Sequence, residues 1–532
     1  MRYNNEQLCR RFEKIKSDRA VIESHWQDLA KFFLPERTAT LIQSVPGQKF
    51  DSTVYDSTGF HALQVAAAGL HGYLTNPTDR WFSLGVPGQD SGEAQEWLHY
   101  VEEDIFDTLN RSTFSEQVHE AYLDLFCFGT TAFYEQEIPG GEVSFHTRPM
   151  SEIFIVEGED GQVDTVFRSF EMTARQAYQR WGKECGDSAM RHMTANKPDE
   201  TVEYLHVVLP REEREYGKKD KYNMPIASVW LDYKTKKVVS EGGYEDMPFF
   251  TPRYSKTSGN VYGYSSCMVG LSDMKMLNAM VKTSIKAAQK LVDPPVILPN
   301  DGFMLPFKTT PGAVNFKNAG LNESFEVLQI PHQLPVGLEM EERRRQMIQG
   351  IMFTDLFLML AQLKDKQMTA REVTERVNER MIVLSPVLGR IMREMLKPVI
   401  MRTFNIRYRN GRIPPPPAEI EGLESTIEFI SPLAMAQKMA KSNQINELMG
   451  TLLSMAQGLP GLVKLIDEIK VGRELAKVYN QSNLLRSDDE LQEIAQMEAE
   501  MMQMQQGLEM AKQGADVAKG LAEVEKMTNE SR

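Results

Sequence analysis

The chain has 532 residues, enough for two to four compact units with sizeable cores. Apolar residues make up 42% of it and charged residues 25%, which is ordinary for a globular protein and excludes a wholly disordered or fibrous chain. The net charge of −14 argues against a protein that coats nucleic acid, because such proteins need a surplus of Lys and Arg, but it does not exclude a protein through which DNA slides.

The four cysteines lie far apart and form neither a CxxC pair nor a cysteine–histidine spacing typical of a metal site. We therefore expect free thiols in a reducing cytoplasm. The N-terminal residues contain no apolar run of the kind found in a signal peptide. The most apolar stretch, residues 351–361, is short and includes Asp355, so no membrane-spanning helix is expected.

The first part of the chain has the apolar spacing of helices. Pro35 ends the first predicted helix, and Asn76-Pro77 ends the second. The small residues at 66–69 would let a neighbouring element approach the second helix closely. The predicted helices cover residues 5–35, 57–75, about 91–110 and about 114–128.

The pattern then changes to one that is typical of strands. Residues 131–170 are rich in β-branched and aromatic side chains and contain turns at Pro139-Gly140-Gly141 and Glu159-Asp160-Gly161, which predicts antiparallel strands. A short helix over 173–181 interrupts them. Further strands are expected over 201–210, 226–240 and 247–254.

A long helix predicted over 265–291 has two different faces. Its apolar residues recur at intervals of three and four, which is typical of one packed face: Met274, Leu277, Val281, Ile285 and Ala288. Another face has four lysines: Lys275, Lys282, Lys286 and Lys290. These lysines are either a solvated surface, which is the ordinary case, or a subunit contact or DNA-facing channel wall.

Prolines bracket an interruption over 293–335, for which short strands and turns are expected. The next helix, over 338–361, includes Arg343-Arg344-Arg345, which fan around its axis so that at most two of them serve one surface. A polar loop over 363–368 follows. Its lysines, Lys364 and Lys366, are either ordinary loop residues or DNA contacts.

The last long helix begins at Thr369, which forms a capping box with Glu372, and extends to about Asn405. We expect Pro386 and Pro398 to kink or segment it.

Four consecutive prolines, Pro414–Pro417, then form a rigid boundary before a helical unit over 433–480. The tail over 488–530, which follows a capping box at Ser487–Glu490, contains no aromatic residue and is not expected to build a core.

The chain contains no motif of a hydrolytic enzyme. A DNA motor would need a phosphate-binding GxxxxGK[ST] loop, which is absent, as are GxSxG and HExxH. His61 and His71 are ten residues apart on one predicted helix and therefore point to different faces. Acidic residues are scattered, and a nuclease would need them to converge in space. We expect no catalytic residue, metal ligand or cofactor.

Several segments spread along the chain carry a resemblance to a known family. They are the opening RFEKIKSDRAVIESHWQDLAKFFLPER, the segment FHALQVAAAGLHGYLTNPTDRWFSL (60–84), residues 114–137 and 163–182, MPFFTPRYSKTSGNVYGYSS (247–266), and residues 368–406 followed by IPPPP. Together they resemble the podovirus-type head-to-tail connector (portal) proteins of bacteriophages, over roughly residues 5–480.

The resemblance implies an α+β, mainly helical portal fold with a wing, long stem helices, a clip and a helical crown. The implied divisions are a wing of helices and β-strands over 1–264, stem helices over 265–292 and 336–361, a clip over 293–335, a tunnel loop over 362–368, a kinked wing helix with a return strand over 369–429, a helical crown over 430–486, and a tail over 487–532 that is a helical barrel or disordered.

The resemblance also implies a function. Portal proteins form a ring, usually of twelve subunits, at one capsid vertex of the virion, and double-stranded DNA passes through it without sequence preference during packaging and ejection. The implied partners are the terminase large subunit, a tail adaptor, and the major capsid and scaffolding proteins. The ring assembles in the host cytoplasm and involves no membrane.

In such a ring, Lys364 and Lys366 would face DNA from the tunnel loop. The residues that would line the channel or contact a neighbouring subunit are Lys275, Lys282, Lys286, Lys290, Arg343 and Arg344. This action is geometric and electrostatic, so no enzyme activity is expected. The alternatives are a packaging enzyme, such as a terminase-like ATPase or nuclease, and another structural protein of the virion.

Overall fold

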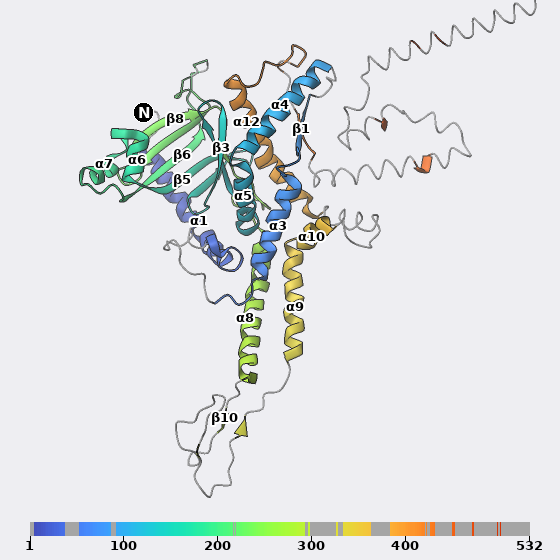
Figure 1. The fold of residues 1–532 in the computed structure, drawn as a ribbon. Helices are drawn as coiled ribbons and strands as arrows, with labels where there is room; N and C mark the ends of the chain where they lie inside the picture. Colours follow the sequence, from blue (N-terminus) through green and yellow to red (C-terminus); the bar gives the residue numbers. More distant parts are fainter. Residues whose placement is uncertain are drawn as a thin grey trace, which may run out of the picture. The chain divides into compact units, whose positions relative to one another are not determined.

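The computed structural model describes residues 5–37, 53–86, 92–215, 217–218, 220–292, 334–362, 383–420 and 426–430, with a few shorter stretches besides. They belong to two compact units, each described here by itself. The first unit comprises Met1–Trp81, Val101–Pro415 and Ser431–Gln437, and the second comprises Phe82–Tyr100, Pro416–Ile430 and Lys438–Arg532. Helices and strands occur together, so the predicted α+β fold is confirmed (Figure 1).

A five-stranded antiparallel sheet lies in the first unit, and its strands follow one another in chain order. They are β4 (Ile153–Glu157), β5 (Val163–Thr173), β6 (Thr201–Pro210), β7 (Ile226–Asp232) and β8 (Lys237–Tyr244). The predicted single strand over 226–240 is wrong, because a turn divides it into β7 and β8, with Lys236 at a φ of 54°. The apolar and β-branched residues on both sides of this turn conceal it in the sequence.

Helices cover both faces of this sheet. Helix α1 (Asn5–Phe33) packs Phe12 against one face, with the ring of Phe12 centred 4.8 Å from that of Phe154. Helices α6 (Ala174–Trp181) and α7 (Asp187–Thr194) cover the other face around Trp230. The predicted short helix is confirmed as α6, which begins with a capping box between Thr173 and Gln176. Helix α7 was not predicted.

A second sheet has the order β3-β2-β9 and packs on helix α5 (Phe114–Phe128). Its strands are β2 (Ala132–Ile138), β3 (Glu142–Arg148) and β9 (Phe249–Phe250), so the predicted strand over 247–254 is much shorter than expected. Helix α5 ends at Gly129, which has a φ of 76°, and an added Cβ there would lie 2.4 Å from the carbonyl oxygen of Gly263. Only glycine fits this turn.

Helix α3 (Thr58–Leu74) contains the small-residue run that was expected to allow a close neighbour. That neighbour is α10 (Thr354–Gln362), because a Cβ on Gly69 would lie 2.3 Å from Cγ of Phe357. The ring of Phe357 is stacked on Tyr73, with centroids 6.5 Å apart. The close approach that the sequence predicted is therefore confirmed.

Two long helices, α8 (Ser266–Val292) and α9 (Leu334–Ile351), lie in the first unit. The predicted continuous helix over 338–361 is wrong, because Met352 and Phe353 separate α9 from α10. Phe353 has a φ of 56°, a left-handed conformation that cannot continue a right-handed helix. Met352 is fully buried, and Thr354 donates a hydrogen bond to the carbonyl oxygen of Gln349 (2.9 Å), so the break is part of the packed structure.

The helix that precedes the proline-rich boundary contains a π-helical turn. Residues 383–391 are α-helical, η2 (Met392–Leu396) is π-helical, and α12 (Lys397–Arg409) completes the helix with Pro398 in its first turn. The expected distortion of the helix therefore occurs directly before Pro398, as the π-helical turn. It does not occur at Pro386, which lies within the α-helical residues 383–391. The turn directs Glu394 toward the buried Arg253, whose Nη2 lies 3.1 Å from its Oε1.

Helix α4 (Gly92–Arg111) confirms the third predicted helix. In the second unit, β1 (Phe82–Gly85) pairs with β12 (Thr426–Phe429). Strands β10 (Val296–Ile297) and β11 (Glu326–Val327) also form an antiparallel pair, as expected of short strands within 293–335. Most of the predicted clip, the start of the helix at Thr369, nearly all of the predicted crown and the tail lie outside the described residues.

All four cysteines, Cys9, Cys127, Cys185 and Cys267, are buried and free of disulfides. Burial raises the pKa of the Cys9 thiol and that of the Cys185 thiol. Burial also raises the pKa of the Cys127 thiol, and its neighbour Cys267 raises it further. The expectation of unpaired thiols is confirmed.

Candidate functional site

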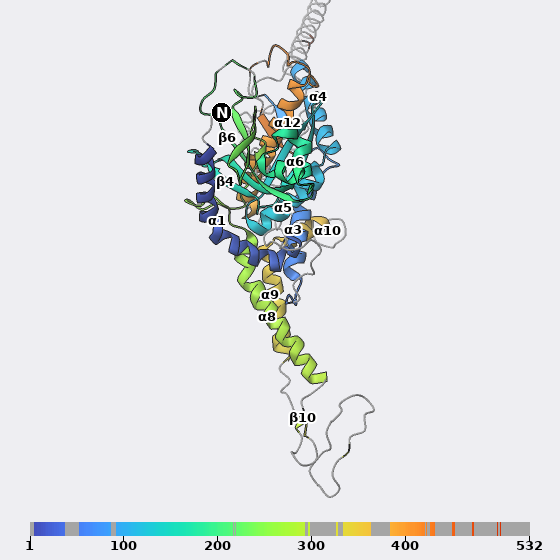
Figure 2. The same ribbon diagram turned by 90° about the vertical axis from the view of Figure 1, so that its left-hand side faces the viewer.

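Helices α8 and α9, here called the helix pair, lie side by side in both ribbon views (Figures 1 and 2). They are antiparallel, because the start of α9 at Gly337 lies near Ser284 while Met352, beyond its end, contacts Cys267. At about 1.5 Å per residue, the 27 residues of α8 span ~40 Å and the 18 residues of α9 span ~27 Å. The helix pair is therefore long enough to make extended contacts with another molecule.

Charged and polar side chains hold the two helices together. Arg344 lies 2.5 Å from Asp273 of α8, measured from Nη1 to Oδ1. Ser284 donates a hydrogen bond to the buried Glu341 at 2.6 Å, and Arg345 reaches the same carboxylate at 3.4 Å. Arg345 also donates two hydrogen bonds, of 3.0 and 3.1 Å, to Asp56. Arg344 and Arg345 therefore bind within the chain.

Arg343 is placed differently from the two arginines that follow it. Its side chain is 73% exposed, and its one ion-pair partner among the described residues is Glu339 of the same helix, at 2.6 Å. An exposed pair one helical turn apart contributes only about 0.3–0.5 kcal/mol, so Arg343 remains available for another molecule. The predicted fanning of the three arginines to different surfaces is what the structure has.

The four lysines of α8 share a face, but their surroundings differ. Lys275 pairs with Asp28 of α1, with Nζ 2.6 Å from Oδ2. Lys282 lies over the ring of Tyr55, with Nζ 5.6 Å from the ring centroid. Lys286 and Lys290 are exposed, and neither has an ion-pair partner among the residues that the structure describes. The C-terminal half of the lysine face, at Lys286 and Lys290, is thus the part that is open to another molecule.

The predicted packed face of α8 is confirmed only in its first half. Met274 and Leu277 are fully buried, whereas Ile285 is 41% exposed, and no residue of α8 after Leu277 is buried. The spacing of apolar residues in α8 continues beyond Leu277, the last residue that the described part of the chain buries. An apolar side chain that no part of its own chain covers is a candidate for contact with another subunit.

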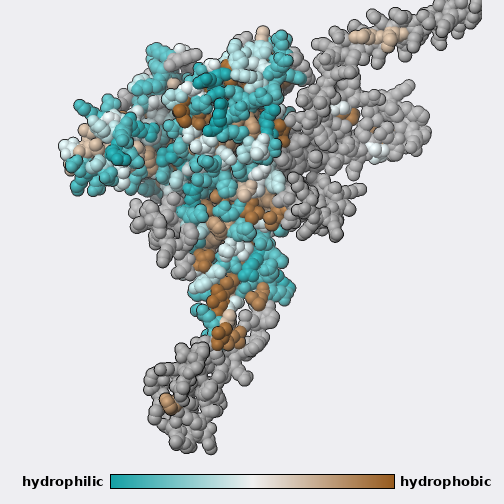
Figure 3. Space-filling model, in the orientation of Figure 1, coloured by the Kyte–Doolittle hydropathy of each residue, from teal (hydrophilic) through white to brown (hydrophobic). Residues whose placement is uncertain are grey.

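Further apolar side chains are exposed on each helix of the pair, and Figure 3 shows apolar surface between polar patches there. On α8, Val269 is 66% exposed and Met276 is 47% exposed. On α9, Met340 and Met347 are each 50% exposed. Both pairs are spaced by two helical turns, so each pair lies on one face of its helix. Sequence reasoning missed both pairs, because their seven-residue spacing shows that each pair shares a face but not that this face is exposed.

Other predicted features can be placed only in part. Lys364 and Lys366 lie outside the described residues. Among the residues that are described, no group of three or more His, Cys, Asp or Glu side chains is arranged to hold a metal ion. Over the same residues, none of the helices combines the length and the apolar character needed to cross a bilayer.

The chain is similar to bacteriophage proteins along most of its length. The family model for "Bacteriophage head to tail connecting protein" matches residues 5–483. A protein named "Probable portal protein" in Bordetella phage BPP-1 is 29% identical over 518 residues, which is 93% of each chain. The portal protein of Salmonella phage epsilon15 is 29% identical and covers 87% of this chain and 85% of its own length. That of Enterobacteria phage T3 is 21% identical over 92% of this chain and 90% of its own.

Proposed function

Because the chain belongs to the family of bacteriophage head to tail connecting proteins and is by its similarity a phage portal protein, we propose that it acts as one subunit of a closed ring whose central channel passes double-stranded DNA. The ring, of about twelve subunits as the resemblance implies, would occupy one capsid vertex. It would dock the terminase large subunit, a tail adaptor, and the capsid and scaffolding proteins. The action needs no covalent step, so we propose that the chain is not an enzyme.

The domain divisions form part of the same proposal. The helix pair would be the stem, the segment 293–335 that joins α8 to α9 would be the clip, and residues 362–368 would be the tunnel loop. The sheets and the helices packed on them would form the wing. Residues 430–486 would form the crown.

The observation that carries the ring proposal is the exposed apolar side chains on the helix pair. Two different surfaces are involved, one on α8 at Val269 and Met276 and one on α9 at Met340 and Met347. Contact between unlike surfaces of neighbouring copies is heterologous, and such contacts close into a ring when the rotation between subunits divides a full turn. Burial of these side chains between subunits would remove the cost of their exposure to water.

The charges of the helix pair fit a channel for DNA. Lys286, Lys290 and Arg343 are exposed, while the chain as a whole has a net charge of −14. A few lysines in an acidic wall would contact phosphates without reading bases, and the surrounding negative charge would keep DNA from binding tightly. Weak contact of this kind suits a duplex that must keep moving.

We expect the purified protein to form rings with a central hole, and we expect Val269→Asp with Met276→Asp to prevent their formation, because two carboxylates would be buried in the contact between subunits. Electron microscopy and light scattering would measure the fraction assembled. The matched control is Val21→Asp, since Val21 is an 82% exposed valine of α1 outside the helix pair. Rings that form equally well in the double variant would refute this interface. Separately, ATP hydrolysis by a homogeneous sample of the wild-type protein would favour the alternative function of a packaging enzyme.

A further inference from the structure

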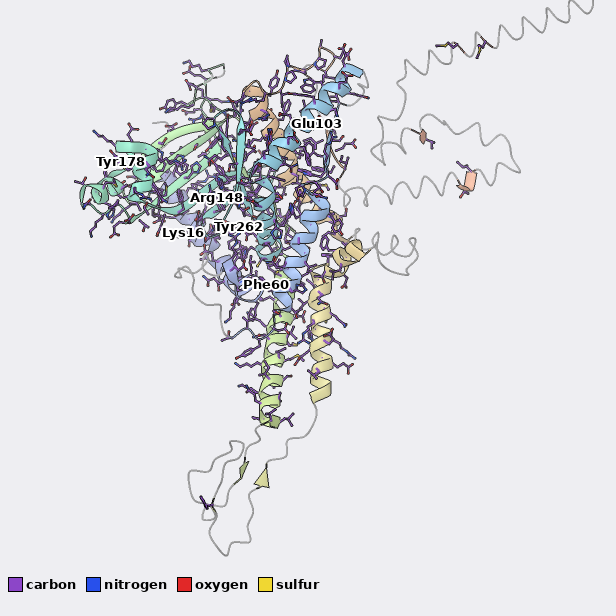
Figure 4. The ribbon with its side chains drawn as sticks, in the orientation of Figure 1. Lys16, Phe60, Glu103, Arg148, Tyr178 and Tyr262 are labelled. Carbon is purple, nitrogen blue, oxygen red and sulfur yellow. The ribbon has the colours of Figure 1, made fainter. Side chains whose placement is uncertain are left out.

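Three arginines gather beside the sheets of the first unit, and they are here called the arginine cluster. They are Arg148 at the end of β3, Arg168 in β5 and Arg180 near the end of α6. Figure 4 labels Arg148 and also Tyr178, which precedes Arg180 by two residues on α6. The cluster lies on the opposite side of the five-stranded sheet from α1 and does not involve the helix pair.

Strand alternation explains how these arginines come to share one side. In β3, Val143, Phe145 and Thr147 are buried, so Arg148 projects from the other face. Arg168 stands opposite His206 of β6, and His206 stands opposite Trp230 of β7, which forms one row across three strands. Helix α6 packs over the same face and brings Arg180 to within 4.1 Å of the centroid of the Trp230 ring.

Each guanidinium group of the cluster lies over an aromatic ring. Arg168 is 3.9 Å from the ring centroid of Phe170, and Arg148 is 5.4 Å from that of Tyr134. The rings occupy one flat face of each guanidinium group and leave the N–H groups at its edge free to donate. The ring contacts therefore help to fix the cluster in position without using its hydrogen-bond donors, of which Arg168 Nε is the one bound to a carboxylate, that of Glu152.

The positive charge of the cluster is balanced only in part by carboxylates of the described residues. Arg168 pairs with Glu152, with Nε 2.8 Å from Oε2. Neither Arg148 nor Arg180 has an ion-pair partner among the described residues, and Nε of Arg148 is buried without a hydrogen-bond partner. Burial, and after it the charge of Arg168, lower the pKa of Arg148 to about 10, against an opposing effect of Glu152. Two arginines thus repel each other where a bound anion would relieve the repulsion.

His206 does not add to this charge. Burial, followed by the charges of Arg168, Arg180 and Arg148, lowers its pKa well below its usual range, so the imidazole is neutral. One of its ring nitrogens lies 2.9 Å from the hydroxyl of Ser228, and its ring is stacked on Trp230 at 3.8 Å. The positive charge of the site therefore belongs to the arginines.

The surroundings favour carboxylates over nucleic acid as the anion. A duplex needs many phosphate contacts along an extended basic surface, whereas this site has only two arginines without a carboxylate partner. A single strand needs free aromatic faces on which its bases can stack. Trp230 is already covered by Arg180 and His206. Carboxylates need only the planar, bidentate donors that the arginines retain.

We propose that the arginine cluster binds the carboxylate groups of an acidic peptide segment from a partner protein, with Arg148 and Arg180 as its main contacts. This site shares no residue with the helix pair. It would give the wing a docking point whose strength falls as salt is added, because its charges are only partly buried.

The test measures binding of a fluorescein-labelled peptide of eight glutamates to the full-length protein by fluorescence anisotropy at low salt. We expect saturable binding that Arg148→Gln with Arg180→Gln weakens by about tenfold or more, since charge-assisted hydrogen bonds are lost. The matched control is Arg175→Gln, an exposed arginine of the same helix α6 outside the cluster, which should leave the affinity unchanged. Thermal unfolding would check that each variant is folded.

Arg180→Lys provides a second variant if the double variant does not fold. It keeps the charge but lacks the planar pair of donors, so the affinity should fall by less than in the double variant. Absence of peptide binding, or equal losses in the Arg175→Gln control, would overturn the proposal. Equally tight, cluster-dependent binding of an eight-nucleotide single strand would assign the site to nucleic acid instead.

Discussion

Glu135 is a fully buried residue of β2. The groups around its carboxylate offset only part of the cost of burying a negative charge. Thr403 donates a hydrogen bond to one of its oxygens at 3.0 Å. The other oxygen lies 3.6 Å from Nε of Arg402 and has no hydrogen-bond partner among the described residues. Burial raises the pKa of Glu135 to about 8, an effect larger than the opposing effects of Arg402 and Thr403. The carboxyl group is therefore protonated in the folded protein at neutral pH.

This pKa makes stability depend on pH in a definite direction. The folded state retains the proton up to about pH 8, whereas the unfolded chain releases it near pH 4.5. Folding thus takes up a proton between these values, and the wild-type protein loses stability as pH rises through that window, by at most about 1.4 kcal/mol per pH unit.

We expect Glu135→Gln to remove this dependence. The difference in free energy of unfolding between variant and wild type should increase from pH 5 to pH 8 in favour of the variant and then remain constant. Urea unfolding at pH 5, 7 and 9 would measure it. Glu137→Gln is the matched control, because Glu137 is exposed on the same strand. A constant difference at all three pH values for Glu135→Gln would contradict the protonated state.

Such residues could not be identified from the sequence. Glu135 is one of three consecutive polar residues in β2, whose sequence AFYEQEI does not show which of them is buried, and its partners are more than 260 positions away in the chain. The lysine face of α8 shows the opposite case, since a spacing visible in the sequence does place four lysines together. The contact that Lys275 makes with Asp28 was nevertheless hidden, because it depends on how α1 packs.

At the scale of elements, the helices and most strands were predictable, because they follow from short-range apolar spacing and from prolines. The break between α9 and α10 was not. Residues 351–361 are apolar on nearly all sides, so periodicity cannot show where one helix ends. The turn at Phe353 instead comes from tertiary packing, in which α10 docks on α3 at Gly69.

We expect Gly69→Ala to destabilise the protein by ~1–3 kcal/mol, because the added methyl group would overlap the Phe357 ring and push α10 away from α3. Gly72→Ala on the same helix is the control, since no atom lies within 4 Å of an added Cβ there. That change should stabilise α3 by up to ~1 kcal/mol. Thermal unfolding would compare the two, and a Gly69→Ala protein as stable as Gly72→Ala would show that α10 is not held this way.

At the scale of the whole molecule, the family was recognisable because its features are the order and number of many segments. Each segment depends on local signals, such as the proline turn after α3 and the small residues within that helix. The number of subunits in a ring is different, since it depends on the angle between copies and no segment of one chain encodes it. The exposed apolar pairs of α8 and α9 were also missed, because exposure is a property of the folded molecule.

The tunnel-loop proposal makes a prediction for the assembled particle. We expect Lys364→Ala with Lys366→Ala to leave rings and capsids normal but to impair DNA packaging or retention, because repeated lysines around the axis would contact phosphates. Packaged DNA length and its loss from particles over time would be measured. Lys16→Ala with Lys31→Ala, on α1, offers a control of equal charge change. Normal packaging and retention in the loop variant would mean that these lysines are ordinary solvated residues.

The buried cysteines have a practical consequence for work on the assembled particle. Thiol reagents attack the exposed thiolate, and all four native thiols are enclosed, with burial holding three of them in the protonated form. A cysteine introduced at an exposed position outside the helix pair, such as Val21, would therefore be the one site that a maleimide dye modifies. Energy transfer between dyes on adjacent copies could then follow motions of the ring while DNA enters, without replacement of any native cysteine.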